Sequence, residues 1–93
     1  MTFEEAAINE FLTGKIVQQD LDPFGISELT VVVAGVRVQA TWYSGWMAHP
    51  RSLRVGNESY PVGAHKIIKT AMKRADSLVG EKLRYLDALV ADE

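Results

Sequence analysis

The chain has 93 residues, of which 47% are hydrophobic and 24% are charged, and it contains no cysteine. This length predicts one domain spanning residues 1–93, because domains usually hold about 50 to 200 residues. The lack of cysteine excludes a disulfide scaffold, a thiolate zinc site and a thiol nucleophile. No apolar run approaches the roughly 18 residues of a membrane span, and the N-terminus is acidic, unlike a secretory signal. We therefore expect a cytoplasmic protein without membrane contact.

Charge is distributed unevenly along the chain. Residues 1–30 carry six acids and one lysine, a net −5, whereas residues 31–90 carry nine bases and four acids, a net +5. Such asymmetry indicates a basic surface for a polyanion or an acidic protein. The alternative is that the basic half folds against the acidic half or is simply solvated. The sequence pI of 5.6 lies well below the basic balance typical of nucleic-acid-binding domains.

The first predicted element is a helix that begins at a capping box. In this motif the Thr2 hydroxyl accepts a backbone hydrogen bond while the Glu5 side chain reaches back to the cap. Apolar residues follow at helical spacing. Because Gly14 weakens the helical pattern, two C-terminal ends are possible: the helix stops at Thr13, or it continues to about Gln19.

A first hairpin is predicted from residues 29–33 and 36–43, joined at Ala34-Gly35. Along the second strand apolar and polar residues alternate, which is the period of a half-buried strand. Ala34-Gly35 is a weaker signal for a hairpin turn than Asn-Gly, because alanine disfavours a positive φ.

A second hairpin is predicted from residues 53–55 and 58–60. Gly56 at the first loop position favours a type II′ turn. Pro61 has no N–H to donate, so the last strand is short or lies at an edge. The two hairpins together predict an antiparallel meander of three or four strands.

Residues 64 to about 91 follow a helical pattern. Its apolar stripe consists of Ile68, Met72, Ala75, Val79, Leu83, Leu86 and Val90. A helix of this length spans roughly 40 Å, whereas a compact domain of this size has a radius of gyration of about 12 Å. Either the helix kinks at Gly80 into a helix–turn–helix end packed on the sheet, or the last segment mediates a homodimer through Leu83, Leu86, Leu89 and Val90. The predicted fold class is α+β, with a helix, the meander and a long helix.

No set of residues in the sequence matches a catalytic or metal-binding motif. The segment from Asp20 to Val31 begins like a calcium loop but lacks the glutamate required at its twelfth position. His49 and His65 are 16 residues apart, with no third ligand at helical spacing. The nucleophile elbow, the phosphate loop and the dinucleotide fingerprint are all missing. We therefore predict that the chain is not an enzyme and uses no metal or other cofactor.

A loop rich in aromatic residues is the first candidate binding feature. Trp, Tyr, Met and Arg are enriched at the centres of protein interfaces, and all four types occur between residues 42 and 51. Trp42 lies on the inner face of its strand, so we assign it to the core. The predicted protein-binding surface consists of Trp46, Met47, Tyr43, Arg51 and Arg54. The alternative is that this loop closes the end of the sheet.

A basic stripe at the start of the last helix is the second feature. Spacings of three, four and eleven place Lys66, Lys69, Lys73 and Arg84 on one face, with His65 and Arg74 at its margins. The alternative is an ordinary solvated face.

The order helix, three strands, helix, together with His65-Lys66-x-x-Lys69, resembles the double-stranded-RNA-binding domain. That family opens its second helix with a Lys-Lys-x-x-Lys cluster that contacts phosphates, so the resemblance implies nucleic-acid binding. The chain departs from the pattern in three ways. His65 replaces the first lysine, the first strand connection is reduced to Ala34-Gly35, and the first helix is acidic.

Two function classes follow from these features. The leading hypothesis is a small non-enzymatic regulator or inhibitor that occludes the surface of a partner protein. Chains of this size and type are common among phage and mobile-element proteins, anti-CRISPR inhibitors included, which is an association by size alone. The alternative is a nucleic-acid-binding module that uses the basic stripe and loses affinity steeply with salt.

Overall fold

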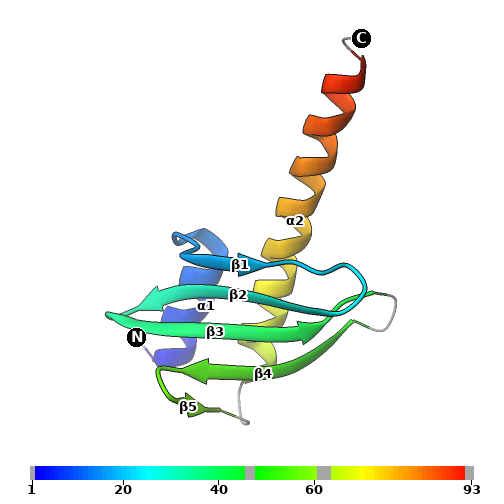
Figure 1. Cartoon of the computed structure of the whole chain (residues 1–93). Coiled ribbons are helices and arrows are strands. Elements are labelled where there is room, and N and C mark those ends of the chain that lie inside the picture. The colour runs from blue at the N-terminus through cyan, green and yellow to red at the C-terminus, as the bar shows by residue number, and fades with distance from the viewer. Residues whose placement is uncertain (1, 46–47, 61–63, 92–93) are drawn as a thin grey trace.

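The computed structural model describes residues 2–45, 48–60 and 64–91, with the backbone alone for residues 64 and 80–91. It shows an α+β fold in which two helices lie on one face of a five-stranded antiparallel sheet (Figure 1). The elements are α1 (Phe3–Thr13), β1 (Gln18–Asp20), β2 (Ile26–Val33), β3 (Val36–Tyr43), β4 (His49–Val55), β5 (Glu58–Ser59) and α2 (Ala64–Ala91). The strands lie across the sheet in sequence order, which confirms the predicted meander. Within the described residues, no helix has the length and apolar character needed to cross a membrane.

Helix α1 begins at the predicted capping box. The Glu5 N–H donates to Thr2 Oγ1 at 3.2 Å, and the Thr2 N–H donates to Glu5 Oε2 at 3.4 Å. The helix ends at Thr13, because Gly14 takes an extended backbone conformation. The alternative of a helix continuing to Gln19 is wrong: residues 18–20 form β1 and pair with β2. This strand was not predicted, since Gln-Gln-Asp carries no apolar alternation.

Both predicted hairpins are present, and the first strand of each is longer than the sequence indicated. Ala34 and Gly35 join β2 to β3 with φ values of 51° and 82°, the positive angles that a two-residue hairpin loop requires. Strand β2 begins three residues before the predicted start at residue 29, and β4 begins four residues before residue 53. The start of β4 includes Pro50, which pairs with β3 beyond a register shift between Thr41 and Trp42. Hydrogen bonding to a neighbouring strand therefore extends β2 and β4 beyond the residues whose apolar–polar alternation predicted them.

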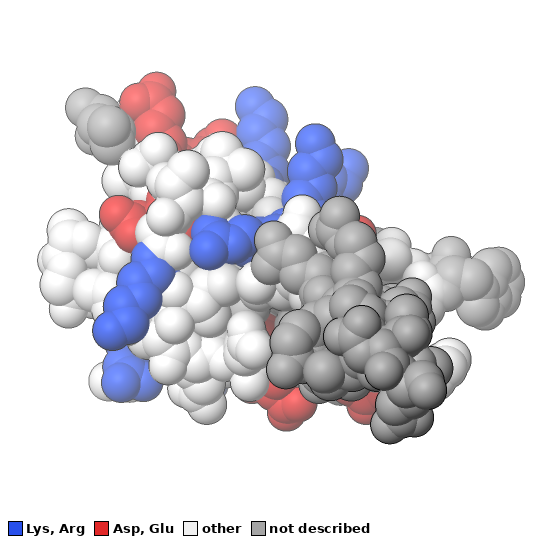
Figure 2. Space-filling model, turned by 90° about the horizontal axis from the view of Figure 1, so that it is seen from above, with Lys and Arg blue, Asp and Glu red and all other residues white. Residues whose placement is uncertain are grey.

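Acidic and basic parts of the chain meet where the two helices begin. Lys66 Nζ of α2 lies 3.9 Å from Glu4 Oε1 of α1, with the Lys66 side chain largely exposed and that of Glu4 partly exposed. Seen from above, basic and acidic side chains are interspersed around the visible face rather than separated into two regions (Figure 2). The acidic and basic parts of the chain therefore share this face, and an ion pair joins α1 to α2.

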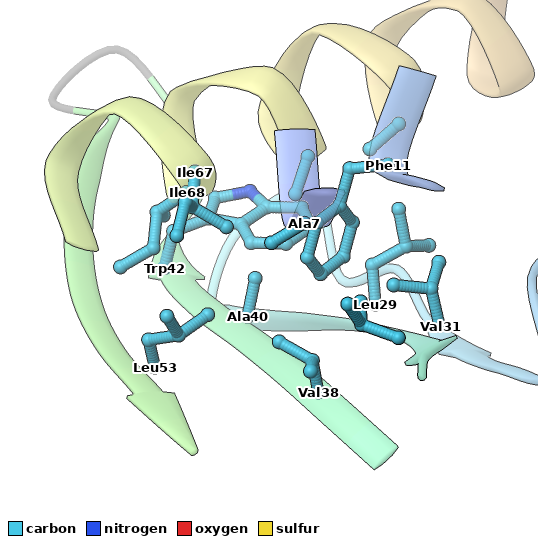
Figure 3. Close-up of a cluster of buried hydrophobic side chains, with 13 residues drawn as sticks. Ala7, Phe11, Leu29, Val31, Val38, Ala40, Trp42, Leu53, Ile67 and Ile68 are labelled. Atoms are coloured by element: carbon cyan, nitrogen blue, oxygen red, sulfur yellow. The ribbon is translucent and has the colours of Figure 1, made fainter. Parts of the chain in front are cut away.

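The hydrophobic core lies between the sheet and the two helices (Figure 3). Ile67 and Ile68 of α2 lie next to Trp42 of β3, and Phe11 of α1 points toward Leu29 of β2. Trp42 is 4% exposed, which confirms its assignment to the core. The buried apolar residues are Ala7, Phe11, Leu29, Val31, Val33, Val38, Ala40, Trp42, Leu53, Ile67, Ile68, Ala71 and Ala75.

Helix α2 is a single helix of 28 residues that runs without a break through Gly80. The alternative of a helix–turn–helix end is therefore wrong. The helix crosses behind the strands and projects past β1 at the edge of the sheet (Figure 1). The molecule measures 49 × 26 × 19 Å, with a radius of gyration of 14.3 Å, above the value of about 12 Å for a compact domain of this size. We call residues 80–91 of α2 the overhang.

Candidate protein-binding groove

Three of the five predicted protein-binding residues are described, and all three lie on the same open face of the sheet. Tyr43 and Arg54 are exposed and alternate with the buried residues Trp42 and Leu53, so both lie on the sheet face that no helix covers. Arg51 joins Tyr43 there, with its guanidinium carbon 5.6 Å from the centroid of the tyrosine ring. Such a cation–π contact contributes about 0.5–1 kcal/mol at an exposed site. The remaining two predicted residues, Trp46 and Met47, lie outside the described residues.

The basic stripe is partly engaged by the chain itself. Arg74, which is half-buried, donates from Nη1 to the Leu12 carbonyl oxygen at 2.7 Å and to that of Phe11 at 3.5 Å. It thereby satisfies carbonyls at the C-terminal end of α1, which have no partner within their own helix. Arg74 consequently has a structural role that its spacing in the sequence did not indicate. Among the described side chains, the exposed members of the stripe are His65, Lys66, Lys69 and Lys73.

The two histidines lie near each other in the fold. The ring centroids of His49, at the start of β4, and His65, in the first turn of α2, are 6.5 Å apart and the rings meet edge-on. Both side chains are exposed. Among the described residues, no group of three or more His, Asp or Glu side chains is arranged to hold a metal ion.

A groove of about 650 Å³ lies where α2 leaves the sheet, between the β1–β2 loop and the helix. Its apolar lining is Leu21, Trp42, Ala75, Leu78 and Val79, and three acidic residues, Asp20, Asp22 and Asp76, also border it. Gly45 closes the groove on the β3 side, and Trp46 follows it directly in the sequence. The groove therefore combines an apolar lining with a negatively charged border.

A hydrogen-bonded turn beside the groove presents Phe24, which is 93% exposed. The Phe24 N–H donates to Asp22 Oδ1 at 3.0 Å, and the Asp22 N–H donates to Ser27 Oγ at 3.0 Å. Ser27 Oγ lies 2.6 Å from Ser44 Oγ, and the Ser44 N–H donates to the Gly25 carbonyl at 2.8 Å. These bonds tie the β1–β2 loop to the end of β3. The hydrogen bonds of this turn therefore fix the backbone around Phe24 while its phenyl ring is exposed to solvent.

The sequence alone did not indicate Phe24 or the groove. Asp20 and Asp22 belong to the incomplete calcium-loop match, which gave no sign that they border an apolar groove. The available signal was a large aromatic residue between Pro23 and Gly25, because a tight turn carries its side chain away from the core. The groove itself has no local signal, since its walls come from segments about 55 residues apart in the chain.

Comparison with known proteins gives no relative for this chain. No protein-family model matches it, and no curated protein or solved structure matches it either. The resemblance to the double-stranded-RNA-binding domain also weakens, because the chain has five strands between its helices rather than three. The groove and the turn beside it are therefore the features from which a function can be inferred.

Proposed function

We propose that the chain is a non-enzymatic protein-binding module whose partner docks in the groove and covers Phe24. The observation that supports this proposal is the 93% exposure of Phe24 on a turn fixed by hydrogen bonds. Burying a phenylalanine side chain contributes about 1.5–3 kcal/mol. Interfaces commonly draw most of their affinity from a few such anchors.

The groove indicates the chemistry of the partner segment. Its volume of about 650 Å³ suits one or two large side chains, since ligand pockets commonly hold about 300–1,000 Å³. The acidic residues Asp20, Asp22 and Asp76 at its border favour a positively charged neighbour. We therefore propose a segment in which a large apolar side chain is flanked by lysine or arginine.

Within this proposal the chain acts in the cytoplasm as a small regulator or inhibitor. Occlusion of a partner surface requires only one binding face, which a domain of this size provides. A phage or mobile-element origin, as in proteins of the anti-CRISPR type, stays a prediction from size alone. The nucleic-acid alternative is less favoured, because Arg74 contacts α1 and Lys66 lies beside Glu4.

Selection of peptides from a random display library against the immobilised chain tests the proposal. We expect enrichment of peptides that combine a large apolar residue with lysine or arginine. Phe24→Ser should weaken their binding about tenfold or more, since 1.4 kcal/mol corresponds to a factor of ten. The matched control is Val32→Ser, which removes an apolar side chain 37% exposed on the open sheet face.

Two outcomes would contradict the proposal. One is the absence of any enriched peptide, and the other is equal binding by wild type and Phe24→Ser. A labelled nucleic-acid duplex at low salt provides the comparison with the alternative. Duplex binding that Lys69→Glu with Lys73→Glu abolishes, and that Phe24→Ser leaves intact, would favour a nucleic-acid-binding module.

A further inference from the structure

The apolar stripe of α2 passes from burial to exposure within a single turn. Ala75 is 5% exposed and belongs to the core, whereas Val79, four residues later, is 43% exposed. Beyond Val79 the backbone continues as helix for twelve residues, a distance of about 18 Å. The stripe therefore continues where the sheet no longer covers it.

The sequence of the overhang continues this stripe in a self-complementary way. Val79, Leu83, Leu86 and Val90 are separated by four, three and four positions, the alternation of a coiled-coil seam. The spacing is the same when read in reverse. Two antiparallel copies centred between residues 84 and 85 place position 79 opposite 90, and position 83 opposite 86. This reciprocal pairing is what a two-fold symmetric interface requires.

We propose that a second copy of this chain covers the overhang, with residues 79–90 of the two α2 helices packed antiparallel. A helical segment of about 12 residues is marginal in water by itself, so packing against a second helix would stabilise the overhang. The antiparallel overlap brings the tip of each helix level with Val79 of the other copy. Val79 also lines the groove, so the contact continues onto the folded part of the partner copy.

Disulfide cross-linking tests this arrangement, because the wild-type chain contains no cysteine. Val79→Cys and Val90→Cys are prepared separately, then oxidised alone and as an equal mixture. We expect a covalent dimer in the mixture only, since antiparallel packing places positions 79 and 90 side by side. Identical positions lie eleven residues apart along the axis, about 16 Å, which exceeds the Cα separation of roughly 4.4–6.8 Å in a disulfide.

Light scattering on the unmodified chain gives the matching measurement of mass. We expect twice the chain mass of 10.3 kDa, and the monomer mass after Leu83→Glu with Leu86→Glu. The control is Ala88→Glu, which adds a charge to the same segment outside the stripe and should leave the dimer intact.

Three results would overturn the proposal. The first is cross-linking of each cysteine variant alone, which indicates parallel helices. The second is a wild-type mass of 10.3 kDa without cross-linking in any sample. The third is dissociation by Ala88→Glu. Val79 borders both surfaces, but the two proposals fail separately: mass and cross-linking report the dimer, whereas loss of peptide binding in Phe24→Ser reports the groove.

Discussion

The two halves of α2 belong to one continuous helix but differ in what surrounds them. In the first half, Ile67, Ile68 and Ala71 are at most 3% exposed and pack against the sheet and α1. The second half projects past the edge of the sheet (Figure 1), although its sequence continues the same apolar stripe. An amphipathic pattern therefore predicts which face of a helix will be buried but not which surface will bury it.

The largest expected effect comes from the packed half. Ile68→Ala should lower the free energy of unfolding by about 3 kcal/mol, because truncating a buried isoleucine loses transfer energy and leaves a cavity. Urea denaturation followed by circular dichroism measures the change. The control Lys69→Ala, at the neighbouring exposed position, should stay within about 0.5 kcal/mol. If Ile68→Ala lowers the free energy of unfolding by less than about 1 kcal/mol, the first half of α2 is not tightly packed and the contrast with the second half fails.

A smaller loss is expected at the polar contact of the packed half. Arg74→Met keeps the aliphatic length and removes the hydrogen bond to Leu12, so the free energy of unfolding should fall by about 1–2 kcal/mol. The same urea titration applies, with Lys73→Met as an exposed control on the adjacent position. Equal effects of the two substitutions would show that the Arg74 contact with α1 contributes nothing specific.

The junction between the two halves is tested at Gly80. Gly80→Ala should raise the free energy of unfolding by about 0.5–1 kcal/mol, because alanine loses less backbone entropy than glycine in a helix interior. Thermal unfolding, with helix content measured on the same samples, records the gain. Destabilisation instead would indicate that the helix needs glycine at this point, which would contradict a continuous α2.

The smallest effect is expected at the solvent-exposed beginning of α2. Lys66→Gln should change the free energy of unfolding by less than about 0.5 kcal/mol, since an exposed ion pair of this kind contributes little. A double-mutant cycle with Glu4→Gln isolates the interaction between the two side chains. A coupling energy above about 1 kcal/mol would show that this contact holds α1 against α2 as strongly as Arg74 does.

Features with a short-range cause were predictable from the sequence. The capping box at Thr2 and Glu5, the hairpin connection at Ala34-Gly35, the core position of Trp42 and the extent of α2 all followed from local patterns. Each depends on backbone preferences or on the period of a single element, and both are written in adjacent residues.

Features that join distant segments were not predictable from local patterns and became visible only in the folded chain. Strand β1 forms because β2 offers it hydrogen-bonding partners, and Arg74 finds the end of α1 across 62 residues of chain. The groove likewise forms where α2 leaves the sheet beside the β1–β2 loop. The type and approximate extent of most elements follow from the amino-acid sequence, because helices and hairpins depend on nearby residues. The fold decided which surfaces stay exposed, because exposure depends on every segment that packs nearby.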